Sequence, residues 1–508
     1  MRSEGPSTPF PIEDAYDREL IANVRPPDWR NPLPRNPYQL LVIGAGPAGL
    51  MAARTAAMLG ARVALIERER LGGDSLNHAS VPTKTIIRTS RTYADMTGAA
   101  QFGAEAPANI QVNFAMAMDR IRRIRALISR RHSAARLTKM GIDLFFGSAR
   151  FTAPDTIEVD NVCLRFKKAM IATGSRPKPV DIPGLPECGY MHAADAFKLT
   201  ALPHSILVIG GGPGGCEGAQ MFARLGARTI IVMTEPLFLP KEERDAAHMV
   251  SDALARDGVE IHLNTRAAAV RVEGGRKVVD LVNDGDVSTI TVDSVFVGTG
   301  RDPVLDGLDL EKAGVISSPE TGIQVDDFLQ TTNPKVYAAG DVCLEHKFTT
   351  AAHASGRLVV RNALFPVRRR MSALTIPWCT YTDPEIAHVG LYVKQARERD
   401  IPVKTFTVPM HAVDRAVIDS EDGGFVKLHI RDGSDRILGA TIVARHAGEM
   451  INEMSLAMVA GIGLKKLARV VRAYPTQAEA VSMAADNYNE TRLTAWHRRL
   501  LRMWWGCT

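Results

Sequence analysis

The sequence predicts an α/β fold with two Rossmann-like dinucleotide-binding domains, followed by an α+β domain. Two glycine-rich turns, at residues 44–49 and 210–215, carry the first part of this prediction. Each turn follows an apolar run typical of a buried strand and precedes a helical pattern, which is the context in which such a turn binds a dinucleotide. The region from residue 376 onward has its own strand patterns and an apolar helix near 450–460, which indicates a further domain.

Composition limits the class of protein. The 508 residues are 45% hydrophobic and 23% charged, which is typical of a globular chain of about three domains. The net charge of +6 suits phosphate-bearing cofactors and does not imply nucleic acid. No basic leader with an apolar core and no long apolar run is present, so we expect a cytoplasmic protein. The six cysteines show no metal-binding spacing, so no metal site is predicted.

The first fingerprint is Gly44-Ala45-Gly46-Pro47-Ala48-Gly49, between the strand 39–43 and a helix to 59. Gly44 permits the tight turn, Gly46 lets the backbone approach a pyrophosphate, and Gly49 packs the helix on the strand. The next strand, 62–66, ends at Glu67, which is placed to bind a ribose hydroxyl.

The second fingerprint runs through Gly210, Gly212 and Gly215 into a helix that carries Glu217. Two such folds in one chain predict two dinucleotides that meet, FAD and a nicotinamide cofactor. Met233 stands where an NADH-specific site would have an acid, and the arginine of an NADPH site is also missing. The nearby Glu235 would repel a 2′-phosphate, which favours NADH over NADPH.

The stretch 71–84, Leu-Gly-Gly-Asp-Ser-Leu-Asn-His-Ala-Ser-Val-Pro-Thr-Lys, resembles the redox loop of the class I pyridine nucleotide-disulfide oxidoreductases. This family includes dihydrolipoamide dehydrogenase, glutathione reductase and mercuric reductase. Ser75 and Ser80 stand where the family has its two redox cysteines. A hydroxyl cannot cycle between thiolate and disulfide, so the two-electron store of the family is missing.

The resemblance covers about residues 38–490 and implies a domain order. We expect an N-terminal extension lying on the surface (1–37), an FAD-binding domain (38–178 and 301–371), an NAD(P)-binding domain (179–300), a dimerisation domain (372–490) and a basic aromatic tail (491–508). It further implies that FAD contacts the following residues beyond the first fingerprint: Gly73, Asp74, Ser75, Lys84, Gly147, Ser148, Thr173, Gly174, Gly300, Arg301, Gly340 and Asp341.

The resemblance also implies site roles. Lys84 and Glu217 match the ion pair beside flavin N5, where an ammonium stabilises the reduced ring. Ser75 and Ser80 would line the opposite face of the flavin, as chemical participants or as passive polar groups. In the family, the partner subunit supplies a His-Pro pair that is followed by a glutamate. Tyr474 stands at the position of this histidine and Glu479 at that of the glutamate. Tyr474 is therefore either a proton donor or a residue packed in the dimer seam.

The sequences at 347–350 and 474–476 are most similar to those of the mercuric reductase-like branch. Mercury reduction needs thiolates at the flavin and a cysteine pair near the C-terminus, and only Cys507 is present there. We therefore expect a homodimer that passes hydride from NAD(P)H through FAD to a small-molecule acceptor such as a quinone, or to oxygen. The alternative is a non-catalytic or redox-sensing flavoprotein that keeps FAD for structure.

Several helices are predicted from periodicity. Residues 14–24, 83–90 and 112–140 show helical patterns, and the arginines of the last are expected to form a solvated face. In the tail, apolar residues recur at helical spacing from 493 to 504 among arginines. This pattern predicts a helix that packs against the partner subunit in the dimer seam, in preference to the alternative of a helix on a membrane surface.

Overall fold

The protein was analysed as a computed structural model, which describes residues 14–105 and 110–506. The chain divides into two compact units. Unit 1 comprises Met1–Val180, Met191–Leu202 and Thr299–Leu374, and unit 2 comprises Asp181–Tyr190, Pro203–Gly298 and Thr375–Thr508. The chain therefore leaves unit 1 and returns to it.

Unit 1 is built on a seven-stranded sheet whose parallel part has the order β3-β2-β1-β6, with β18 also paired to β6. The residues of β1 and β2 are almost all buried, as expected of strands that are covered on both faces. The strands of unit 1 are β1 (Tyr38–Ile43), β2 (Val63–Glu67), β3 (Asp143–Phe146), β4 (Ala149–Ala153), β5 (Thr156–Val159), β6 (Val162–Ile171), β7 (Ser175–Pro177), β15 (Arg301–Pro303), β16 (Ser317–Ser318), β17 (Gly322–Ile323) and β18 (Val336–Ala338).

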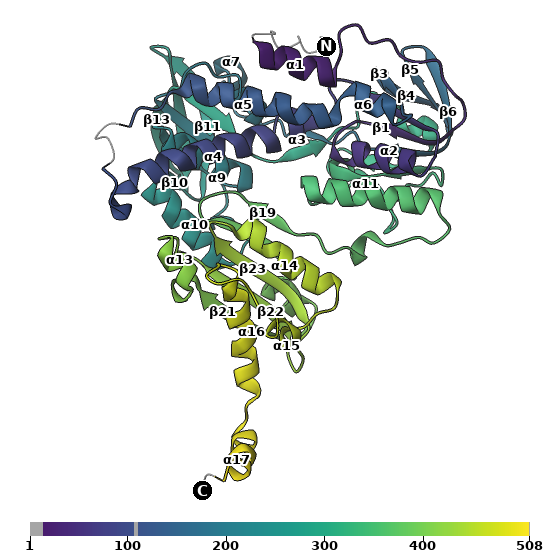
Figure 1. The fold of residues 1–508 in the computed structure, drawn as a ribbon. Coiled ribbons are helices and arrows are strands. Elements are labelled where there is room, and N and C mark those ends of the chain that lie inside the picture. Colours follow the sequence, from purple (N-terminus) through teal and green to yellow (C-terminus); the bar gives the residue numbers. More distant parts are fainter. Residues whose placement is uncertain (1–13, 106–109, 507–508) are drawn as a thin grey trace. The chain divides into compact units, whose positions relative to one another are not determined.

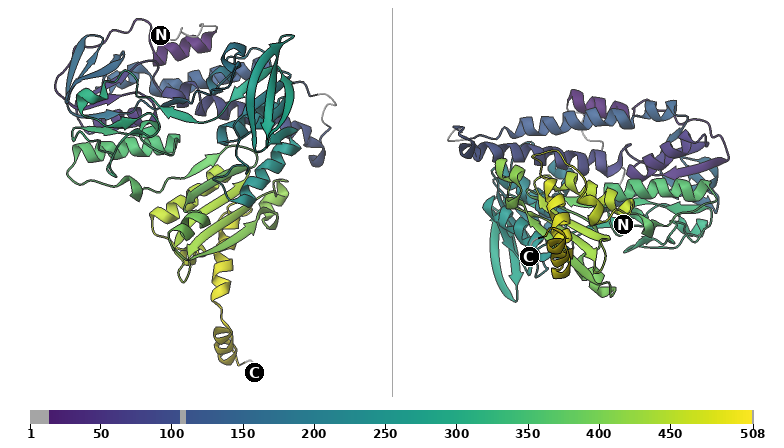
Figure 2. Two further views of the ribbon diagram at one scale, coloured as in Figure 1. Left: turned by 180° about the vertical axis from the view of Figure 1, so that it is seen from behind. Right: turned by 60° about the horizontal axis from the view of Figure 1, so that its bottom comes forward.

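Helices α2 (Pro47–Met58) and α11 (Thr349–Leu364) lie side by side on this sheet (Figure 1). Gly356 makes their close approach possible, because a Cβ there would lie 2.3 Å from the carbonyl oxygen of Ala48. The other helices of unit 1 are α1 (Ala15–Val24), α3 (Gly73–Asn77), α4 (Ser80–Thr97), α5 (Phe114–Ser129), α6 (Ala134–Lys139) and α8 (Ala193–Ala196). Helix α5 packs against both α1 and α4 (Figure 2).

Three expectations for this region need correction. The helix predicted over 112–140 ends at Ser129, because Ser133 takes an extended conformation and its hydroxyl caps α6 at the Arg136 N–H. The arginines of α5 do not form a simple solvated face, since Arg122 pairs with Asp14 and Arg125 is only partly exposed. Helix α1 is not only a surface extension, because Leu20 and Val24 belong to the core.

Unit 2 contains a parallel sheet, β10-β9-β8-β14, an antiparallel sheet, β11-β12-β13, and a five-stranded antiparallel sheet, β19-β20-β23-β22-β21. The strands are β8 (Ser205–Ile209), β9 (Arg228–Val232), β10 (Val259–His262), β11 (Thr265–Glu273), β12 (Arg276–Asn283), β13 (Asp286–Val292), β14 (Ser294–Val297), β19 (Trp378–Thr380), β20 (Glu385–Gly390), β21 (Val403–Pro409), β22 (Phe425–Arg431) and β23 (Ile437–Ala444).

The helices of unit 2 cover these sheets, and α14 and α16 pack on the five-stranded one. They are α7 (Leu185–Cys188), α9 (Pro213–Arg224), α10 (Arg244–Arg256), α12 (Val393–Glu398), α13 (Asp414–Ile418), α14 (Ala447–Val459), α15 (Leu464–Leu467), α16 (Glu479–Arg492) and α17 (Ala495–Trp504). Within the described ranges, no helix is both long and apolar enough to cross a membrane.

Candidate flavin and nicotinamide sites

The first glycine turn has the geometry of a phosphate cradle. Gly44 has φ +99°, and a Cβ there would lie 2.4 Å from the Ala172 carbonyl oxygen. A Cβ on Gly49 would lie 1.8 Å from the Gly44 carbonyl oxygen. Only glycine fits at these two positions. Helix α2 begins just after Gly46 with Pro47 in its first turn, so its unpaired N–H groups are available to an anion.

Glu67, at the end of β2, stabilises this turn through hydrogen bonds. Its carboxylate accepts hydrogen bonds from the N–H groups of Ala45 and Glu69, both at 2.7 Å. Burial raises the pKa of Glu67, although these two bonds oppose the shift. The Glu67 carbonyl also accepts from the N–H of Gly147 at 3.0 Å. Glu67 and Gly147, two of the predicted FAD contacts, are therefore linked through the backbone.

The loop of residues 71–84, which carries Ser75 and Ser80, begins directly against the phosphate turn. A Cβ on Gly73 would lie 2.7 Å from the Cα of Gly46, and the Gly72 N–H donates to the Ala45 carbonyl at 2.8 Å. The next residue, Asp74, accepts a hydrogen bond from Arg301. The loop and the glycine turn thus form one surface.

Arg301 connects this loop to a second polar cluster. Its guanidinium donates to the hydroxyl and the carbonyl oxygen of Ser175, both at 2.7 Å. The Ser175 hydroxyl donates in turn to Asp341 at 2.7 Å. The predicted flavin contacts Asp74, Arg301 and Asp341 are therefore joined through Ser175, a residue that the sequence reasoning missed.

Three further turns, at 173–174, 300 and 340, are predicted to contact the flavin. The Thr173 hydroxyl donates to the Val304 carbonyl at 2.7 Å. A Cβ on Gly174 or on Gly300 would meet no atom within 4 Å, so the backbone is bare on those sides. The Gly340 N–H donates to the Ser355 hydroxyl at 3.1 Å.

The two serines are joined by a third hydroxyl. The Oγ1 of Thr349 lies 3.1 Å from the Oγ of Ser80 and 3.4 Å from the Oγ of Ser75. Ser75 lies in α3, whereas Ser80 begins α4 and Thr349 begins α11. Lys84 follows Ser80 by one helical turn, so both lie on one face of α4. Sequence reasoning missed Thr349 because it lies far from the loop in the chain.

Cys343 is the cysteine nearest in the chain to Asp341. Burial raises the pKa of its thiol to about 12, and the Asp341 charge acts in the same direction. Its Sγ donates to the Gly340 carbonyl at 3.6 Å. Cys343 is therefore a protonated, structural thiol at neutral pH. Cys507 lies outside the described residues.

The second glycine turn, in unit 2, repeats the geometry of the first. Gly210 has φ +106°, and a Cβ on Gly215 would lie 2.0 Å from the Gly210 carbonyl oxygen. A Cβ on Gly212 or on Gly214 would meet no atom within 4 Å, which leaves the approach to the start of α9 clear. This surface fits a nicotinamide dinucleotide.

Met233 and Glu235 follow β9 beside this turn. Met233 is buried with its side chain against Gly211, so it contributes shape and no ribose-binding carboxylate. Glu235 is exposed, and one of its carboxylate oxygens accepts from the Thr234 hydroxyl at 3.4 Å.

Glu217, on α9, accepts a hydrogen bond from the Tyr381 N–H at 2.9 Å. Gln220, on the same helix, bonds both the N–H and the carbonyl of Asp383. The start of the five-stranded sheet is therefore tied to α9. Glu217 belongs to unit 2 and Lys84 to unit 1, so their pairing stays a prediction.

Tyr474 is 70% exposed and its phenol donates to Asp414 at 2.7 Å. This bond raises the pKa of Tyr474. Glu479 begins α16, and its buried Oε2 has no hydrogen-bond partner among the described residues. Both features are compatible with groups that act across a dimer seam, and their roles stay predictions.

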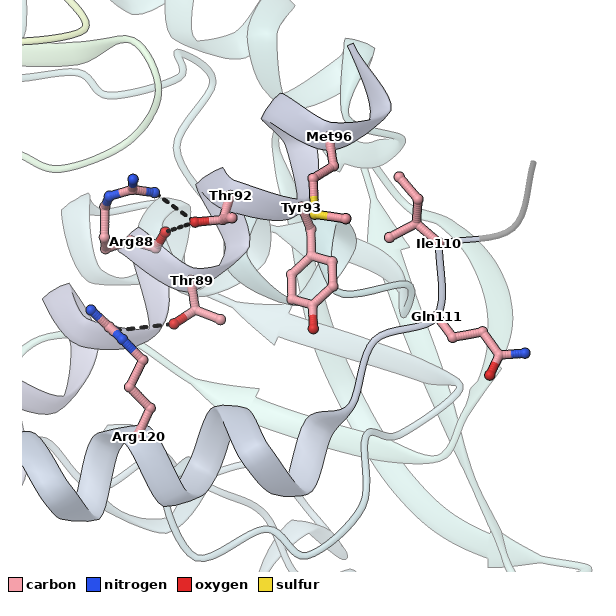
Figure 3. A pocket seen from close by; sticks show the side chains of 8 residues that line it. All are labelled: Arg88, Thr89, Thr92, Tyr93, Met96, Ile110, Gln111 and Arg120. Atoms are coloured by element: carbon pink, nitrogen blue, oxygen red, sulfur yellow. Dashed lines mark hydrogen bonds between the residues drawn. The ribbon is translucent and has the colours of Figure 1, made fainter. Parts of the chain in front are cut away.

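A separate pocket of about 590 Å³ lies on unit 1, between α4, α5 and residues 110–111 (Figure 3). Arg88 donates to the Thr92 hydroxyl at 2.6 Å, and Arg120 donates to the Thr89 hydroxyl at 3.2 Å. None of the predicted site residues lines this pocket.

Comparison with known proteins agrees with this geometry. Residues 38–356 match the family described as pyridine nucleotide-disulphide oxidoreductase, and residues 376–485 match its dimerisation domain. The chain belongs to this family. Members of the pyridine nucleotide-disulphide oxidoreductase family bind FAD and NAD(P)H, and they are FAD-dependent oxidoreductases. The presence of the family's dimerisation domain supports a homodimer.

Individual relatives are similar over most of their length. A mercuric reductase of Lysinibacillus sphaericus is 31% identical over 453 residues, which cover 89% of this chain and 83% of the relative. A dihydrolipoyl dehydrogenase of Thermus scotoductus is 32% identical, with 88% and 97% covered. Among solved structures of this family, LpdA from Mycobacterium tuberculosis has a TM-score of 0.82 at 26% identity, with 90% and 100% covered. The flavoprotein disulfide reductase RclA from Escherichia coli has a TM-score of 0.79 at 28% identity, with 88% and 99% covered.

Proposed function

We propose that this protein is an NAD(P)H oxidoreductase that uses FAD without a redox disulfide, and that it reduces a non-disulfide acceptor such as a quinone. The Ser75–Thr349–Ser80 hydroxyl cluster carries this proposal. Ser75 and Ser80 lie in the loop that resembles the redox loop of the family, and Thr349 reaches them from the start of α11. None of its three groups can store electrons, because a hydroxyl forms neither a thiolate at neutral pH nor a disulfide.

The overall reaction is balanced without a thiol. NAD(P)H supplies a hydride, a proton comes from solvent, and a quinone takes up both to leave as the quinol. Bound FAD supplies the two-electron transfer between the nicotinamide and the acceptor. The chain positions the cofactors with its two glycine turns, and the ammonium of Lys84 favours negative charge on its side of the site.

The hydroxyl cluster has a proton-handling role in this proposal. Serine and threonine hydroxyls each donate one hydrogen bond and accept others, so a proton can be passed along the three oxygens. Tyr474 of the partner subunit is the proposed donor at the outer end. A phenol is protonated at neutral pH because its ordinary pKa is about 10, so Tyr474 can donate a proton but is a poor base.

Anaerobic titration of the purified yellow protein with NADH tests the proposal. The flavin absorbance should bleach directly with two electrons per FAD, and no long-wavelength thiolate band should form. A requirement for four electrons, or a band that disappears when thiols are alkylated, would contradict the proposal. A screen of quinones follows: steady NADH oxidation supports the enzyme, whereas bound FAD with negligible turnover supports a non-catalytic flavoprotein.

A further inference from the structure

The C-terminal helix α17 is amphipathic and fully formed. Its N-terminus is defined by Thr494, whose hydroxyl accepts from the His497 N–H at 3.4 Å. At 100° per residue, Trp496, Leu500, Met503 and Trp504 fall on one face. The arginines at 498, 499 and 502 fall on the other. The sequence alone predicted this stripe, and the structure adds that no residue of the helix is buried.

The apolar face is large for an exposed helix. Trp496 is 64% exposed and Trp504 is 80% exposed. Three of the five tryptophans of the protein, at 496, 504 and 505, lie in this short segment. Tryptophan favours the boundary between water and lipid, where its ring is partly buried and its N–H stays hydrated.

The charged side chains of residues 491–506 are all basic. Residues 491–506 include four arginines, at 492, 498, 499 and 502, and no aspartate or glutamate. A basic face beside an aromatic face complements anionic lipid headgroups above an apolar layer. An anionic membrane offers negative charge over its whole surface. A protein partner would need an acidic patch at the matching place.

The position of the helix in the chain points away from the dimer seam. The match to the dimerisation domain ends at residue 485, within α16, so α17 lies outside the matched residues. We propose that α17 is an interfacial helix that holds the protein on an anionic membrane surface. This proposal goes beyond the proposed reaction and does not depend on which acceptor is used.

Flotation of the full-length holoprotein with lipid vesicles tests the proposal. The protein should float with vesicles of phosphatidylglycerol and phosphatidylcholine and should remain behind with pure phosphatidylcholine. Binding should weaken as the salt concentration rises, because the attraction is electrostatic. The combined change Arg498→Glu, Arg499→Glu and Arg502→Glu should lower binding by roughly tenfold or more. The pair Trp496→Ser and Trp504→Ser should also release the protein.

Matched controls separate the helix from general charge. The combined change Arg397→Glu, Arg399→Glu and Arg431→Glu alters the same number of exposed arginines in unit 2 and should leave flotation unchanged. A chain that ends at residue 492 should stay dimeric by light scattering and should lose flotation. Absence of flotation by the full chain would overturn the proposal. Dissociation of the shortened dimer would also overturn it, because it would place α17 in the dimer seam.

The same variants keep this proposal separate from the proposed reaction. The shortened chain should oxidise NADH with a water-soluble quinone at the rate of the full chain. Absence of flotation by a full chain that does oxidise NADH with the quinone contradicts only the membrane role. Flotation by a protein that reduces no quinone contradicts only the reaction.

Discussion

The hydroxyl oxygens of Thr349 and Ser80 lie 3.1 Å apart, and Thr349 also contacts Ser75 at 3.4 Å. The first residue of α11 thus bridges two serines that come from α3 and α4. Two cysteine sulfurs in a disulfide are about 2.05 Å apart. A disulfide would join the two loop positions directly. In this chain the two hydroxyls are instead linked through the hydroxyl of Thr349.

Restoring the thiols tests how far the loop keeps the family geometry. The double change Ser75→Cys and Ser80→Cys should give a thiol pair that accepts two electrons and produces a long-wavelength band on reduction by NADH. The single change Ser75→Cys is the control, because one thiol cannot form the disulfide. Absorbance spectroscopy under anaerobic conditions measures the band. A double variant without the band would mean that the backbone here differs from that of the family.

The change Thr349→Val removes the bridging hydroxyl and keeps the size of the side chain. If the hydroxyl cluster passes a proton, quinone reduction should slow by roughly tenfold or more, while flavin reduction by NADH keeps its rate. Stopped-flow measurement of each half-reaction separates the two effects. Thr349→Ser keeps a hydroxyl and should restore most of the rate. Equal slowing of both half-reactions in the valine variant would indicate a structural role only.

The choice between NADH and NADPH should depend on Glu235. Its exposed carboxylate lies just beyond β9 and would repel a 2′-phosphate there. Glu235→Ala should therefore raise kcat/KM for NADPH by roughly tenfold, with little change for NADH. Glu398→Ala, an exposed glutamate of α12, is the control. A wild-type protein that already prefers NADPH would contradict this assignment.

The stability of unit 2 should depend on pH through Glu243. Burial alone would raise the pKa of this carboxyl, but His429 and Lys427 outweigh it and hold the pKa at about 2, below its usual 4.5. Its carboxylate lies 3.2 Å from His429 Nε2 and 3.1 Å from Lys427 Nζ. A lowered pKa contributes stability that is present above pH 4.5 and is lost as the pH falls toward 2.

Thermal unfolding between pH 6 and pH 3 measures this contribution. Glu243→Gln should lower the melting temperature at pH 6 and should flatten its decrease with acid. At pH 6 the lowering of the Glu243 pKa corresponds to about 3 kcal/mol of stability, from 1.36 kcal/mol for each pKa unit. Glu398→Gln is the exposed control and should follow the wild-type curve. Parallel curves for wild type and Glu243→Gln would show that this carboxyl is not the source of acid sensitivity.

The sequence alone determined the family and the cofactors, because these depend on local patterns. Gly44 and Gly210 have a positive φ, and a close carbonyl oxygen excludes a side chain at Gly44 and at Gly215, so both dinucleotide turns can be predicted directly from the sequence. The serines at positions 75 and 80, where the resemblance predicts cysteines, are also a local feature of the sequence. Helix boundaries were less well determined, since the break at Ser133 depends on a cap and not on periodicity.

Only the tertiary structure placed Thr349 between Ser75 and Ser80, and Ser175 between Arg301 and Asp341. These contacts join residues that are far apart in the chain, and no spacing rule predicts them. The partial burial of Arg125 on α5 was missed for the same reason, because α1 packs on a helix whose composition alone indicated a solvent-exposed face. Local sequence fixes backbone conformation and element type, whereas packing decides which side chains meet.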